Sequence, residues 1–142
     1  MGILDKLFGG GQEYPPLEQT DPIAERLAAY EETLGLLCEE ISDPLEVIPT
    51  EHAAYVFIGK PPKKFGFAWI EGDTVHNFKT LVDKRGMNPM SLQILSEQLR
   101  DAYTMSTAGT RFSAAVRGRP VVVNSSEPLQ TQLDGIIEKV AH

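Results

Sequence analysis

The chain has 142 residues, a formal net charge of −7 and a sequence pI near 4.9. This length suits one ordinary domain whose core needs neither disulfides nor a structural metal. The acidic balance argues against general nucleic-acid binding, and the single cysteine, Cys38, excludes an intramolecular disulfide and a multi-cysteine zinc site. Because a lone thiol is typical of a reducing compartment and no apolar run is long enough to span a bilayer, we expect a cytoplasmic protein.

The first 19 residues have the composition of a flexible tail. Gly9 to Gly11 and the Pro15-Pro16 pair separate the start of the chain from the rest, which predicts a single domain over residues 20–142. Within the tail, four apolar residues recur at helical spacing: Ile3, Leu4, Leu7 and Phe8. They predict either a disordered start or a short amphipathic turn that makes weak contact with a membrane or a partner.

Three helices are expected from caps and apolar periodicity. The first follows Asp21 as N-cap and Pro22, continues to Ile41, and carries an acidic face opposite its apolar stripe. A second helix begins at Asn88-Pro89 and ends before Gly109, and a third follows Ser125 or Ser126. In each, apolar residues recur every three or four positions, which predicts one buried face per helix.

Five strands are expected, at residues 53–58, 65–71, 74–81, 111–117 and 121–123. The turn Gly72-Asp73 fits a type II′ hairpin, which places Trp69 opposite His76. Gly118-Arg119 marks a second hairpin. The predicted fold is α+β, with a five-stranded, mostly antiparallel sheet flanked by helices in the order αβββαββα, in which the third and fourth strands point the same way.

The two faces of the central hairpin differ in side-chain size. Gly66 and Ala68 give one small face, on which we expect a helix. The other face belongs to an aromatic group made up of Tyr55, Phe57, Phe65, Phe67, Trp69 and Phe78. This group is typical of a core, and also of a ligand pocket or a dimer face.

Motifs of the common enzyme classes are absent from the sequence, including phosphate-binding loops, nucleophile elbows and zinc-protease signatures. We therefore predict no catalytic, cofactor-binding or metal-binding residue. His52 and His76 would form a metal or acid/base site only if their strands paired; the alternative is one exposed histidine and one packed beside Trp69. Acidic neighbours and an apolar stripe predict that Cys38 is a buried, unreactive thiol.

Basic residues gather at one end of the expected sheet. Tracing strand direction places the loop 60–64, the loop at 84–85 and the hairpin at 117–119 at the same end, opposite Glu51, Glu71 and Asp73. The predicted anion-binding and partner-binding residues, seven of the 13 basic residues, are Lys60, Lys63, Lys64, Lys84, Arg85, Arg117 and Arg119. A solvated rim of loop cations is the alternative.

The sequence therefore predicts a non-catalytic binding or regulatory domain that engages an anionic partner, preferably an acidic protein surface. A homodimer through a sheet edge or the aromatic face is one arrangement compatible with it. The alternative is a small-ligand-binding protein or an enzyme whose site lies between the aromatic strands and carries no linear motif.

Overall fold

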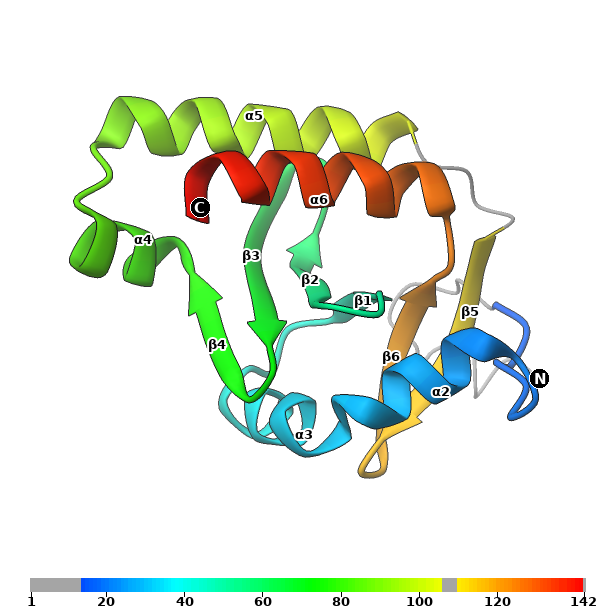
Figure 1. Ribbon diagram of the computed structural model, residues 1–142. Helices are drawn as coiled ribbons and strands as arrows, with labels where there is room; N and C mark the ends of the chain where they lie inside the picture. The colour runs from blue at the N-terminus through cyan, green and yellow to red at the C-terminus, as the bar shows by residue number, and fades with distance from the viewer. Residues whose placement is uncertain (1–13, 106–109, 142) are drawn as a thin grey trace.

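The computed structural model describes residues 14–105 and 110–141 and shows three layers (Figure 1). A six-stranded sheet, in the order β4-β3-β2-β1-β6-β5, lies between two helical layers. The strands are β1 (Leu45–Pro49), β2 (Ala54–Lys60), β3 (Lys64–Glu71), β4 (Thr74–Asn77), β5 (Arg111–Val116) and β6 (Arg119–Asn124). The helices of the described residues are α2 (Pro22–Ala29), α3 (Glu31–Glu40), α4 (Phe78–Arg85), α5 (Pro89–Met105) and α6 (Glu127–Ala141).

The expectation of five strands was wrong because it missed β1, which lies in the middle of the sheet. β1 pairs antiparallel with β2 and parallel with β6, so the sheet is mixed. All five residues of β1 are buried. A strand buried on both faces shows no alternation of polar and apolar residues, and Pro44 and Pro49 at its ends made the segment resemble a loop. The expected parallel direction of the strands that flank α5, β4 and β5, is confirmed by the pairing.

The first helix is interrupted at Tyr30. Asp21 caps α2 as expected, its carboxylate accepting from the Ile23 amide at 2.9 Å. Tyr30, with φ −107° and ψ 7°, then separates α2 from α3. Its hydroxyl donates to the Thr50 carbonyl at 3.3 Å, which ties the break to the β1–β2 turn. The single helix expected over residues 22–41 is therefore two helices. The predicted apolar stripe is nonetheless buried from Ile23 to Leu37 and partly buried at Ile41.

The hairpin between β3 and β4 confirms the expected turn, but its second strand is shorter than expected. Gly72 has a φ of +64°, and Trp69 pairs with His76. The strand expected over residues 74–81 ends at Asn77, however, and Phe78 begins α4. Asn77 and Thr80 form a capping box, with the Asn77 side chain accepting from the Thr80 amide at 3.0 Å and the Thr80 hydroxyl accepting from the Asn77 amide at 2.8 Å. This reciprocal cap favours a helix over the β-propensity of the segment.

The β5–β6 hairpin turns one residue earlier than expected. The two loop residues are Arg117 and Gly118, with φ values of 50° and 84°, because Val116 pairs with Arg119. Two consecutive positive φ angles are typical of a type I′ turn. Arg119, expected in the turn, is the first residue of β6.

Each face of the sheet has its own hydrophobic core. α5 and α6 cover Tyr55, Phe57, Phe67 and Trp69, so this part of the aromatic face is core. α2 and α3 cover the opposite face, on which Ile70 and Val56 lie, as the small side chains of β3 predicted. No helix of the described residues is both long enough and apolar enough to cross a membrane.

Residues 15–17, from the segment expected to be a tail, lie against the edge of β5. The Ser113 amide donates to the Pro15 carbonyl and the Leu17 amide to the Ser113 carbonyl, each at 2.8 Å. The earlier part of the tail, including Ile3, Leu4, Leu7 and Phe8, lies outside the described residues.

Candidate functional site

The seven predicted basic residues lie in three places. The β2–β3 and β5–β6 hairpins lie at the same end of the sheet. Leu45, at the start of β1, pairs with Ile58, near Lys60, and β6, which is parallel to β1, starts at the same end. Their loops meet different helical layers, however. Figure 1 shows the β2–β3 connection below α5 and the β5–β6 hairpin beside α3.

Arg117 and Arg119 are directed to α3. The Arg119 guanidinium donates to the Cys38 carbonyl at 2.7 Å and also to the carbonyls of Ile41 and Asp43, near the end of α3. The side chain of Arg117 crosses Gly35, where an added Cβ would lie 2.6 Å from its Cδ. Backbone carbonyls without helical partners thus bind Arg119, and the hairpin is held on α3.

Lys60, Lys63 and Lys64 belong to the β2–β3 hairpin and are exposed. Their loop is attached to α5, because Arg100 donates from Nε to the Pro62 carbonyl at 2.8 Å. The Arg100 guanidinium also lies 5.8 Å from the centre of the Phe65 ring. Three exposed lysines on an anchored loop give a local positive charge.

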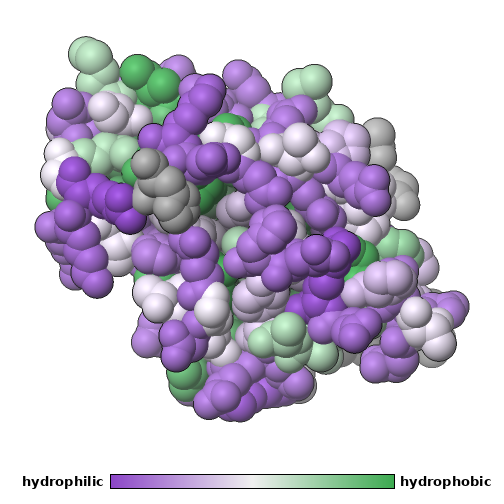
Figure 2. Space-filling model, viewed as in Figure 1, coloured by the Kyte–Doolittle hydropathy of each residue, from purple (hydrophilic) through white to green (hydrophobic). Residues whose placement is uncertain are grey.

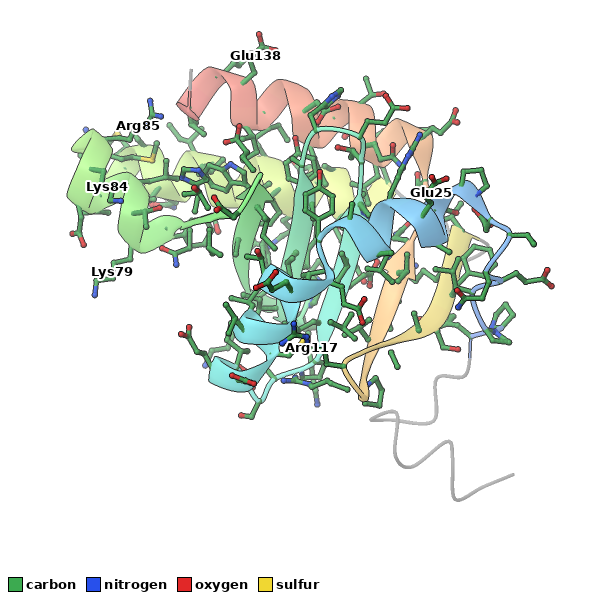
Figure 3. All side chains as sticks on the ribbon, turned by 60° about the horizontal axis from the view of Figure 1, so that its bottom comes forward. Glu25, Lys79, Lys84, Arg85, Arg117 and Glu138 are labelled. Carbon is green, nitrogen blue, oxygen red and sulfur yellow. The ribbon has the colours of Figure 1, made fainter. Side chains whose placement is uncertain are left out.

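Lys84 and Arg85 line a pocket of about 280 Å³, which we call the α4 pocket. Its remaining lining residues are Trp69, His76, Thr80 and Leu81. Figure 3 shows both cations, with Lys79, on α4 and well separated from Arg117. The α4 pocket is therefore the place where part of the predicted basic cluster meets part of the predicted aromatic group.

The inner wall of the α4 pocket is a stacked pair. The rings of Trp69 and His76 lie 5.0 Å apart at an angle of 20°. Glu71 holds both: its carboxylate accepts from Trp69 Nε1 at 2.9 Å and lies 3.6 Å from His76 Nε2. The wall is thus fixed by stacking and by one carboxylate, while Lys84 and Arg85 stand at the exposed rim.

The capping box of Asn77 and Thr80 fixes the start of α4, the helix that carries Lys84 and Arg85. Gly86, with a φ of +66°, ends the helix in the left-handed conformation. α4 is thus defined at both ends by local hydrogen bonds, and Lys84 and Arg85 lie in its last turn. The arrangement suits an anionic group held by two cations beside an aromatic surface.

A second polar cluster, around Glu46, is buried beneath the end of α5. The Glu46 carboxylate accepts from Arg111 Nε, Asn124 Nδ2 and the Tyr103 hydroxyl, each at 2.9 Å. The Arg111 guanidinium lies 4.9 Å from the centre of the Tyr103 ring. Two causes raise the pKa of Tyr103 well above its usual value: burial, which has the larger effect, and the nearby Glu46 carboxylate. Since the carboxylate has three partners from β5, β6 and α5, the cluster joins the parallel strand pair to the helix above it.

Sequence reasoning missed the Glu46 cluster. Its one signal was a charged residue inside the apolar run from Leu45 to Pro49, and that run was not recognised as a strand. Burial of a carboxylate is costly unless it is paired, so a glutamate in a buried strand indicates a buried partner.

Tyr55 and Asp134 form a further contact between the sheet and α6. The Tyr55 hydroxyl donates to Asp134 Oδ1, and burial, followed by this hydrogen bond, raises the pKa of Tyr55 far above its usual value. The folded state therefore retains this proton more strongly than the unfolded chain. The resulting stability is fully present below about pH 10 and is lost as the pH rises further.

We accordingly expect alkaline destabilisation in which Tyr55 takes part. The free energy of unfolding should fall above about pH 10, by up to about 1.4 kcal/mol per pH unit from this one group. In Tyr55→Phe the decline should be shallower, because the phenylalanine does not titrate. Urea unfolding at a series of alkaline pH values measures it. Equal slopes for the two proteins would show that Tyr55 does not contribute.

His52 and Cys38 are not among the residues that line the α4 pocket. His52 is exposed in the β1–β2 turn, and no group of three or more His, Cys, Asp or Glu residues able to hold a metal occurs within residues 14–105 and 110–141. Cys38 is half-buried; burial raises the pKa of its thiol, against the opposing effect of Arg119.

Comparison of the chain with protein-family models, with curated proteins and with solved structures found no match.

Proposed function

We propose that this protein is a non-catalytic binding domain that uses the α4 pocket to recognise an acidic segment of a partner protein. The observation that carries the proposal is the convergence of Lys84 and Arg85 with the stacked pair of Trp69 and His76 around one pocket. A carboxylate entering the pocket would meet two cations at its rim.

The size of the α4 pocket favours a side chain over a larger ligand. Its volume of about 280 Å³ lies just below the range of pockets that enclose drug-sized molecules. One acidic side chain would occupy it and leave the rest of the partner on the surface around α4.

Apolar groups beside α4 favour a protein as the partner. Met90 and Ile94, one turn apart at the start of α5, are 72% and 51% exposed. Val82 of α4 is 41% exposed. Figure 2 shows green hydrophobic surface at the upper left, over the start of α5, next to the purple surface of α4. A partner that carries both acidic and apolar residues would contact both kinds of surface, whereas a small inorganic anion would use only the cations.

A peptide titration tests the proposal. The fluorescence of Trp69, the one tryptophan in the chain, is monitored while a short peptide rich in Glu and Leu is added at low salt. We expect saturable binding that weakens as the NaCl concentration rises. Replacing Lys84 and Arg85 by Glu should weaken it by about tenfold or more, because attraction becomes repulsion at the rim.

The matched control reverses the same amount of charge on the β2–β3 hairpin, with Lys60→Glu and Lys63→Glu. This variant should bind the peptide nearly as well as the wild type. Equal loss in both variants would mean that overall charge, not the α4 pocket, binds the peptide. Tighter binding of citrate than of the peptide would favour the alternative of a small-ligand receptor.

A further inference from the structure

A second cavity, of about 490 Å³, lies between α2 and the outermost strand β5. We call it the edge groove. Small residues from both elements line it: Ala24 and Ala28 of the helix, and Ala114 and Ala115 of the strand. Leu27 and Val116 are buried in the core below and also line it. The edge groove is therefore a largely apolar depression at the margin of the sheet.

Within the described residues, the edge of β5 next to this groove pairs with the segment 15–17. Ser113 uses both its amide and its carbonyl to bind the segment 15–17. Because the backbone groups of a strand alternate in direction, the amide and carbonyl of Ala115 point to the same outer side. The segment leaves the strand at Leu17 and turns into α2, and Ala115 is exposed. Among the residues that the structure describes, the apolar groove thus adjoins a sheet edge that is paired through the one bridge at Ser113.

We propose that residues 3–8 of the same chain fold back and occupy the edge groove. These residues lie outside those that the structure describes, and they supply Ile3, Leu4, Leu7 and Phe8. They are followed by a five-residue connection, residues 9–13, that begins with three glycines and ends at Tyr14. Tyr14 directly precedes the segment that is paired with Ser113 and that itself lines the groove through Pro16 and Leu17.

The short connection through residues 9–13 favours residues 3–8 over any other segment as the occupant of the edge groove. A connection of that length spans at most about 18 Å when extended, so residues 3–8 remain within reach of a groove whose rim begins at Pro16. Short flexible linkers give effective concentrations in the millimolar range, which favours even a weak apolar contact. Glu31 lines the groove and is exposed, and both Asp5 and Lys6 lie between the apolar pairs of the segment.

The contact is tested on the full chain with a spin label. The label is attached at Asp5→Cys in a Cys38→Ser background, and the amide signals of the protein are recorded by NMR. We expect Ala28, Ala114 and Ala115 to lose most of their intensity, while Asp73, in the turn at the opposite edge of the sheet, keeps its own. Adding Leu7→Asp and Phe8→Asp to the labelled chain should restore the groove signals, because the apolar contact is removed.

A mixed sample identifies the source of the segment. Protein that carries the spin label but no isotope label is combined with isotope-labelled protein that has no spin label. Loss of groove signals in this mixture would show that a second copy supplies the segment, which would overturn the proposal. The proposal would also be overturned if, in the first experiment, the amide signals of the groove kept their full intensity in the chain that carries the spin label. A segment that instead lost its own signals only when anionic vesicles were added would be a membrane contact, which would contradict the proposal as well.

Discussion

Replacing Glu46 by alanine is expected to lower the free energy of unfolding by about 3–5 kcal/mol, because it leaves the buried Arg111 without its carboxylate. Arg111 is 9% exposed, and its Nε lies 2.9 Å from Glu46. The same change removes the acceptor of the hydrogen bonds from Tyr103 and Asn124. Urea unfolding at neutral pH, monitored by circular dichroism, gives the difference.

Two further variants separate the charge from the hydrogen bonds. Asn124→Ala removes one donor to the carboxylate and should cost about 1.5–3 kcal/mol. Replacing both Glu46 and Arg111 by apolar residues of similar size, Leu and Met, should cost less than Glu46→Ala alone, because neither charge of the ion pair then remains buried. A loss below about 1 kcal/mol for Glu46→Ala would mean that Arg111 finds water or another partner easily.

Truncating one leucine in each core should be the second large effect. Leu34 of α3 and Leu133 of α6 are both 0% exposed and belong to different cores. Each Leu→Ala change is expected to lower the free energy of unfolding by about 2–5 kcal/mol, through lost burial and the cavity that remains.

The double variant tests whether the sheet separates the two cores. The effects of Leu34→Ala and Leu133→Ala should add to within about 0.5 kcal/mol, because the residues lie on opposite faces and share no neighbours in either core. Denaturant midpoints of the wild type, the single variants and the double variant give the coupling energy. A coupling well above that value would show that the two layers repack together.

Local sequence signals predicted the elements that have local causes. The caps at Asp21 and Asn88 are present, with the Asn88 side chain accepting from the Ser91 amide at 2.8 Å. The Gly72-Asp73 hairpin and its Trp69–His76 pair are also confirmed. Each cap is a hydrogen bond between residues two or three positions apart, and the hairpin register follows from the turn at Gly72, so the local sequence contains the determining interaction.

Features that depend on distant partners were not predicted. β1 is a strand because β2 and β6 lie on both sides of it, and its sequence alone resembled a loop between two prolines. Tyr30 interrupts the first helix, and its hydroxyl donates a hydrogen bond to the carbonyl of Thr50, which directly follows β1 in the sequence. The predicted basic cluster followed strand direction correctly for the hairpins, but direction does not reveal which helical layer a loop contacts. Arg119 therefore lies against α3, and Lys84 and Arg85 at the α4 pocket.

The most direct test of the proposed function is the NMR signal of the Trp69 indole N–H, recorded during a titration with the Glu- and Leu-rich peptide. The chain contains one tryptophan, so the signal is unique. The indole N–H donates a hydrogen bond to Glu71, and Trp69 forms part of the wall of the α4 pocket. We expect this signal and the amide signals of α4 to shift together as peptide is added, and all of these shifts to give the same dissociation constant. Shifts confined to residues 60–64 or 117–119, with the Trp69 indole and α4 unchanged, would contradict the assignment of binding to the α4 pocket.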